Sequence, residues 1–176
     1  MIKKDTPLKD VLGHGKICTQ KCGHCCNYGT GCLVDDDIVY IAKFLNISEK
    51  ELQEKYLEEV EKFNTKLLRP KIIKKNEAMP YGKCVFLKDD FGCSIHPVKP
   101  LQCQVGTCAE HGEDLSIWFS LNYFLNLNDP ESIRQFASYL RAGGKTLENG
   151  KLHELVKDKE LLAKILRYED MVKKNE

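Results

Sequence analysis

KICTQKCGHCCNYGTGC, residues 16–32, places five cysteines within seventeen positions, and two of them are adjacent at Cys25 and Cys26. Thiolates bind zinc tetrahedrally or hold iron–sulfur clusters, and spacings of two or three residues let one loop surround a metal centre. The glycines in the stretch permit the tight backbone that such a loop requires. Five thiols this close together favour a metal-binding loop over a set of small buried side chains.

A second group of cysteines comes later in the chain, at Cys84, Cys93, Cys103 and Cys108. Residues 84–96, CVFLKDDFGCSIH, predict two short strands joined by an Asp/Gly turn that would hold Cys84 close to Cys93. The total of nine cysteines is odd, so an all-disulfide arrangement would leave one unpaired. Because disulfides rarely persist in a reducing compartment, metal binding is the better explanation.

The adjacent pair Cys25 and Cys26 predicts a division of the thiols into two sites, because neighbouring side chains tend to diverge. We expect one site to contain Cys18, Cys22, Cys25 and Cys32. The second site would contain Cys26, Cys84, Cys93 and Cys103. Cys108 would be an extra thiol or would replace one of these eight.

Histidines beside cysteines are further candidate ligands. His24, His96 and His111 could each supply a nitrogen to a metal, although a surface or supporting role is the better expectation with so many thiols present. His14 and His153 have no neighbouring cysteine and receive no role.

Charge and hydropathy limit the expected binding partners and the expected localisation of the protein. A formal net charge of +1 gives no general electrostatic attraction to nucleic acid or to an anionic membrane. The first residues contain no secretory signal, and no apolar run is long enough to span a membrane. We therefore expect a cytoplasmic protein that binds neither nucleic acid nor membranes, with an unidentified protein partner as an open alternative.

Hydrophobic periodicity predicts a mainly α-helical fold. A helix is expected from Ile38 to Leu45, and a second is expected to start at the Ser48–Glu51 capping box. The apolar face of that second helix would continue to Pro70 through Leu52, Tyr56, Val60, Phe63 and Leu67.

The C-terminal part, which contains no cysteine beyond Cys108, predicts further helices. One apolar face contains Ile117, Trp118, Leu121, Phe124 and Leu125, and a second helix begins at Asp129–Pro130. A loop at residues 141–151 and a last amphipathic helix from Lys159 complete the pattern. We predict one mainly α domain over residues 1–176 with a small β-hairpin: a cysteine-cluster metal-binding region at 16–108 with a helical insert, and a helical extension at 109–176.

The spacing Cys18-x3-Cys22-x2-Cys25 also occurs in radical S-adenosylmethionine enzymes, where it holds a four-iron cluster with one open iron. Such enzymes carry the motif in a larger partial barrel of alternating strands and helices, whereas this chain is mainly helical. This interpretation is therefore the less favoured one.

The two cysteine segments together resemble the YkgJ-type CxxCxxCC family, a zinc- or iron-chelating domain. The resemblance rests on CTQKCGHCC at 18–26 and on CVFLKDDFGCSIHPVKPLQC at 84–103. It implies a ligand set of Cys18, Cys22, Cys25, Cys26, Cys84, Cys93 and Cys103, with Cys32 and Cys108 as candidate additions. Three positions depart from the family pattern: a three-residue first gap, His96 in place of tyrosine, and Lys99 in place of arginine, which loses the planar guanidinium fork.

Three functions follow as hypotheses. The first is a protein whose iron–sulfur cluster or zinc has a redox, cofactor or scaffolding role. The second is an enzyme of methyl-transfer type that uses S-adenosylmethionine, as the relation of the family to the cysteine-rich part of flagellin lysine N-methylase implies. The third is a structural zinc module for protein–protein interaction. Sequence alone leaves open whether the chain is an enzyme.

Overall fold

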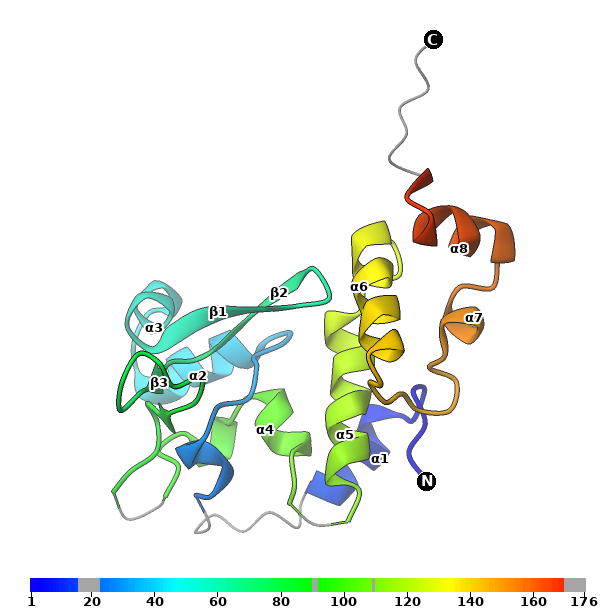
Figure 1. Ribbon diagram of the computed structural model, residues 1–176. Helices are drawn as coiled ribbons and strands as arrows, with labels where there is room; N and C mark the ends of the chain where they lie inside the picture. The colour runs from blue at the N-terminus through cyan, green and yellow to red at the C-terminus, as the bar shows by residue number, and fades with distance from the viewer. Residues whose placement is uncertain (16–22, 90–91, 109, 170–176) are drawn as a thin grey trace.

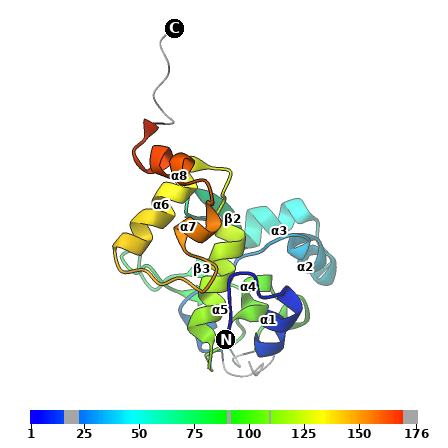
Figure 2. The ribbon, with the colours of Figure 1, turned by 90° about the vertical axis from the view of Figure 1, so that its right-hand side faces the viewer.

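The computed structural model describes residues 1–15, 23–89, 92–108 and 110–169 of the chain. Figure 1 shows the segments from η1 to α4 on one side and helices α5 and α6 on the other. The first helix, α1 (Leu8–Gly15), lies near α4 and α5 at the base of the molecule in both views (Figures 1 and 2). The predicted class, mainly helical with a small hairpin, is confirmed.

Two short helices follow the first cysteine segment. Helix α2 (Asp37–Leu45) confirms the expected helix and ends at Asn46, whose left-handed backbone (φ 55°) stops it. Helix α3 (Glu49–Tyr56) begins where predicted, because the Ser48 side chain accepts a hydrogen bond from the Glu51 amide. These helices bury Ile41 and Leu52 against the segment that carries Cys84.

The expected continuation of the second helix to Pro70 is wrong, because α3 ends at Tyr56. Strands β1 (Leu57–Lys62) and β2 (Thr65–Pro70) form an antiparallel hairpin in its place. The two residues between the strands, Phe63 and Asn64, have φ values of 50° and 55°, as a two-residue type I′ turn requires. Burial in β1 follows the period of two of a strand, although the apolar spacing there also fits a helix.

The two short strands expected within residues 84–96 are present as a single antiparallel bridge, and residues 90–91 of the expected turn lie outside the described residues. Strand β3 (Ile72–Ile73) pairs with β4 (Lys83–Cys84), and Leu87 then bridges to Cys93 in antiparallel register. The Ser94 amide donates to the Phe86 carbonyl at 2.9 Å, which extends the pairing. After a 3₁₀ turn, η2 (His96–Val98), the chain enters a helix that the periodicity did not predict, α4 (Leu101–Val105).

The C-terminal part is helical, as predicted. Helix α5 (Gly112–Phe119) continues into a π-helical turn, η3 (Ser120–Phe124), and α6 (Pro130–Arg141) begins with the Asp129 side chain accepting from the Glu131 amide. Two shorter helices, α7 (Leu152–Leu155) and α8 (Lys159–Leu166), pack beyond α6.

The main core surrounds α5 and the turn after it. Leu115, Trp118 and Phe119 are buried there against Val11 of α1 and Val105 of α4. The Trp118 indole also donates to the Thr6 carbonyl at 3.0 Å, which ties the N-terminal segment to this core. No helix in the described ranges combines the length and the apolar character needed to cross a membrane.

Candidate metal centre

Of the seven cysteines that the structure describes, six line one cavity of about 640 Å³. Its wall combines the 3₁₀ turn η1 (Cys25–Asn27), strand β4, the segment after the Leu87–Cys93 bridge, and α4. The cysteines that line it are Cys25, Cys26, Cys84, Cys93, Cys103 and Cys108, and the histidines are His24 and His96. Donor side chains from separate segments of the chain therefore line the same cavity.

Cys25 and Cys26 lie in the same cavity, with their Sγ atoms 4.0 Å apart. The expected divergence of the two side chains is therefore wrong, whereas the division of the cysteines into two sites stays a prediction, because Cys18 and Cys22 lie outside the described residues. The reason is local, because successive side chains of a 3₁₀ turn are separated by about 120°, whereas those of a strand point to opposite faces. Local contacts stabilise this turn. The side-chain amide of Asn27 donates to the Gly23 carbonyl at 2.9 Å, and Gly23 adopts a left-handed backbone with φ 59°.

Cys84 and Cys93 are placed by the second hairpin. Cys84 is buried in β4, and Cys93 stands opposite Leu87 in the antiparallel bridge. Both pack against the apolar cluster that includes Phe86 and Ile95. The hairpin predicted for this segment thus brings both thiols to the cavity wall.

Cys103 is placed by α4, whose first turn is anchored to α2. A carboxylate oxygen of Asp37 accepts hydrogen bonds from the Leu101 amide at 2.8 Å and from the Val34 amide at 2.9 Å. Opposite Cys103 lies Gly31, where a Cβ atom would be 2.6 Å from the Cys103 Sγ. The absence of a side chain at Gly31 leaves the room that this thiol occupies.

Burial raises the pKa of most thiols in the cavity. The pKa of Cys103 is raised to about 12 and that of Cys84 to about 11, in both cases chiefly by burial, with the neighbouring cysteines adding to it. Burial also raises the pKa of Cys93. These thiols cannot become thiolates together without a compensating positive charge, and a metal ion supplies such a charge.

Cys25 differs from the other thiols because its thiolate is stabilised by its neighbour. The two Sγ atoms share a hydrogen bond in which either can donate, and this contact lowers the pKa of Cys25 to about 6 and raises the pKa of Cys26. Lys99, which lines the cavity, also lowers the pKa of Cys25. The cavity therefore contains one readily formed thiolate beside several protonated thiols.

His96 lines the same cavity and carries a nitrogen without a hydrogen-bond partner among the described residues. Its Nε2 is buried and has no hydrogen-bond partner among the described residues, and burial lowers the pKa of the ring. A neutral imidazole with one unused nitrogen is a suitable metal ligand. The departure from the family pattern at this position thus supplies a nitrogen donor where a tyrosine is usual.

The other candidate ligands have different positions. Cys32 is buried in the main core, where burial raises its pKa to about 11, and it is not among the described residues that line the cavity. Cys108 is exposed at the cavity wall, and Cys18 and Cys22 lie outside the described residues. His111 lies 3.8 Å from the carboxylates of Glu110 and Asp114 rather than at the cavity.

The donors surround the cavity without enclosing a single ion. Within the part of the chain that the structure describes, no three histidine, cysteine, aspartate or glutamate side chains are arranged to hold one metal ion. The chemistry of the donor set nevertheless fits a thiophilic metal, because it consists of clustered thiols and one unpartnered imidazole nitrogen.

The comparisons with known proteins agree with this chemistry. A family model named CxxCxxCC and described as a "putative zinc- or iron-chelating domain" matches residues 17–121, which include every cysteine of the chain. No curated protein and no solved structure matches the chain. Since the family model covers more than half of its residues, the chain belongs to the CxxCxxCC family of zinc- or iron-chelating domains.

Proposed function

We propose that the cavity holds a thiolate-ligated centre of more than one metal ion, an iron–sulfur cluster in the first place, that serves as a redox cofactor or as a scaffold. The observation that carries this proposal is the meeting of six thiols and the unpartnered His96 nitrogen in one cavity. One tetrahedral ion takes four ligands, so this donor set exceeds the needs of a single ion. Cys18 and Cys22 are expected to add to it from the adjoining segment.

The number and the spread of the described donors favour a cluster over a single ion. The described donors are gathered around about 640 Å³ without three of them converging on one ion position. An iron–sulfur cluster holds its thiolates around several iron atoms and therefore needs donors that stand farther apart.

A zinc centre is the second candidate, and the pair Cys25 and Cys26 favours it. At a metal–sulfur distance of about 2.3 Å, two thiolates on one tetrahedral ion lie about 3.8 Å apart. The 4.0 Å between their Sγ atoms is close to that spacing. Zinc would then connect η1 to the other cysteine segments as a structural crosslink.

Metal analysis of protein purified without oxygen separates the two candidates. We expect a coloured protein with iron and acid-labile sulfide in similar amounts. Zinc without iron or sulfide would contradict the cluster and support the structural zinc centre. Addition of S-adenosylmethionine to the same sample tests the methyl-transfer hypothesis. An unchanged visible spectrum and an unchanged paramagnetic signal would contradict that hypothesis.

A pair of matched variants tests the ligand set. Cys84→Ala and Cys32→Ala each remove one buried sulfur, but only Cys84 lines the cavity. We expect Cys84→Ala to lose most of the metal and Cys32→Ala to retain it, with folding of both checked by circular dichroism. Equal metal content in the two variants would contradict the assignment of the cavity as the metal centre.

A further inference from the structure

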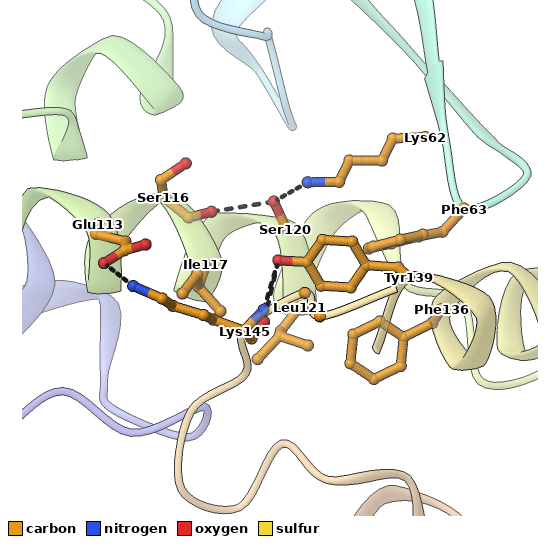
Figure 3. Close-up of a pocket in the computed structure, with 12 residues that line it drawn as sticks. Lys62, Phe63, Glu113, Ser116, Ile117, Ser120, Leu121, Phe136, Tyr139 and Lys145 are labelled. Atoms are coloured by element: carbon orange, nitrogen blue, oxygen red, sulfur yellow. Dashed lines mark hydrogen bonds and ion pairs between the residues drawn. The ribbon is translucent and has the colours of Figure 1, made fainter. Parts of the chain in front are cut away.

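A second cavity, of about 350 Å³, lies between the β1–β2 hairpin and the helices α5 and α6 (Figure 3). Its wall is formed by the end of β1, by α5 and the π-helical turn, by α6, and by the loop at 143–145. Ser116 lines both this cavity and the cysteine cavity, so the two meet at α5. We call it the Lys62 cavity.

Lys62 places a positive charge in this cavity without a negative partner. It is the last residue of β1, and its half-buried side chain donates from Nζ to the Ser120 Oγ at 2.9 Å (Figure 3). Among the residues that the structure describes, no carboxylate lies within ion-pair distance of this Nζ, and burial lowers the pKa of the lysine. The ammonium has therefore lost part of its hydration, and the Ser120 oxygen and the rings of Phe63 and Tyr139, at 5.1 and 5.7 Å from Nζ, compensate only in part, so a bound anion would stabilise it.

The other lysine of the cavity is already neutralised. Lys145 Nζ lies 2.8 Å from the Glu113 carboxylate at the opposite side of the cavity, as Figure 3 shows. Ser120 directs its own hydroxyl to the Ser116 carbonyl at 3.0 Å, so its oxygen remains available to Lys62. The unbalanced charge of the cavity is consequently the single ammonium of Lys62.

Aromatic side chains support part of the remaining wall and are firmly positioned, beside polar groups that form much of its accessible surface. Phe63 contacts the rings of Phe136 and Tyr139 at centroid distances of 5.3 and 5.6 Å, and Phe136 is 1% exposed. The Tyr139 hydroxyl accepts from the Lys145 amide and donates to the Lys145 carbonyl, both at 3.1 Å. Gly144 lies against the Tyr139 ring, where a Cβ would be 2.4 Å from it. An apolar ligand group would thus meet a preformed surface.

We propose that the Lys62 cavity binds a small carboxylate with an apolar body. The carboxylate accepts a hydrogen bond from Lys62 Nζ, and the apolar body lies against the partly exposed side chains of Ile117 and Tyr139. A single unbalanced ammonium selects one negative charge, and the aromatic wall selects an apolar remainder over a fully hydrated inorganic anion. This binding site does not depend on the proposed metal centre.

Calorimetric titration of the full-length protein with phenylacetate tests the proposal. Phenylacetamide, of the same shape but without charge, is the first control, and inorganic phosphate, an anion without an apolar body, is the second. We expect phenylacetate to bind about tenfold or more tightly than phenylacetamide, because a hydrogen bond to a charged group contributes that much. Phosphate should bind weakly and should not displace phenylacetate.

Two lysine variants on the same hairpin locate the site. Lys62→Met keeps the length of the side chain and removes its charge, so it should reduce phenylacetate binding about tenfold or more and abolish the preference over the amide. Lys66→Met changes an exposed lysine that pairs with Glu59 and should leave binding unchanged. Thermal unfolding of both variants shows whether the fold is retained.

Three results would overturn the proposal. The first is the absence of phenylacetate binding at millimolar concentration. The second is equal binding of acid and amide, and the third is unchanged phenylacetate binding in a folded Lys62→Met protein. If Lys62→Met does not fold, Lys62→Arg provides the test, since it keeps the charge and should retain the preference for the acid.

Discussion

The two cavities that meet at Ser116 differ in how readily their lining residues can be identified from the sequence. The cysteine cavity collects residues of one rare type from two dense groups, so its residues can be recognised from their order in the chain alone. The Lys62 cavity is built from common residues on β1, α5, α6 and a loop, none of which belongs to a motif. A motif therefore reveals the first kind of site, and only long-range packing reveals the second.

Metal removal should have the largest effect and should separate the two regions. A ligand that binds only the folded state at a thousandfold excess over its dissociation constant contributes about 4 kcal/mol to the free energy of unfolding. We expect a chelator to remove at least that much, measured by denaturant unfolding. Amide hydrogen exchange should accelerate around residues 84–103, while α5 and α6 keep their protection. Equal acceleration in both regions would contradict this division of stability.

Gly31→Ala tests how tightly the cysteine cavity is packed. The new Cβ would be 2.6 Å from the Cys103 Sγ and 2.7 Å from the Cys103 amide nitrogen. Such overpacking should lower the free energy of unfolding by about 1–3 kcal/mol and reduce the metal content. Gly29→Ala is the matched control, because nothing lies within 4 Å of its Cβ position. Similar losses in both variants would mean that the contact with Cys103 is not the cause.

Asn64→Ala tests the hairpin turn that positions Lys62 in the second cavity. Asn64 holds a left-handed backbone (φ 55°), and its side chain donates to the Asp129 carboxylate at 2.7 Å. Loss of both features should lower the free energy of unfolding by about 1–2 kcal/mol and weaken phenylacetate binding, with metal content unchanged. Asn64→Gly tolerates the backbone conformation and should cost less. A loss of metal in Asn64→Ala would show that the two cavities are coupled.

Lys62→Met should have the smallest effect on stability. The variant removes a half-buried charge that has no carboxylate partner among the described residues, and it also removes the weak attraction of Lys62 Nζ to the Phe63 ring at 5.1 Å. These contributions oppose each other, so the free energy of unfolding should change by less than about 1 kcal/mol. A larger loss in a denaturant titration would assign Lys62 a structural role and weaken the case for a binding site.

Local signals in the sequence were sufficient for much of the fold. The Ser48 and Asp129 caps, the helix at α2 and the helical C-terminal part follow from side chains that act on their own backbone or within one helical face. The hairpin at 57–70 differs from the predicted helix because its apolar residues fit both periods. The turn at Phe63–Asn64 and the contacts of Asn64 with α6 decide between them.

The sequence by itself determined the family of the chain and the places where several helices begin, and it predicted which cysteines would bind metal. Only the tertiary structure decided that Cys25 and Cys26 share a cavity, that Cys32 belongs to the core, and that Lys62 has no carboxylate beside it among the described residues. The physical reason is the separation along the chain of the residues that interact. Donor type and capping are properties of a few neighbouring residues, whereas burial and side-chain convergence depend on how distant segments pack.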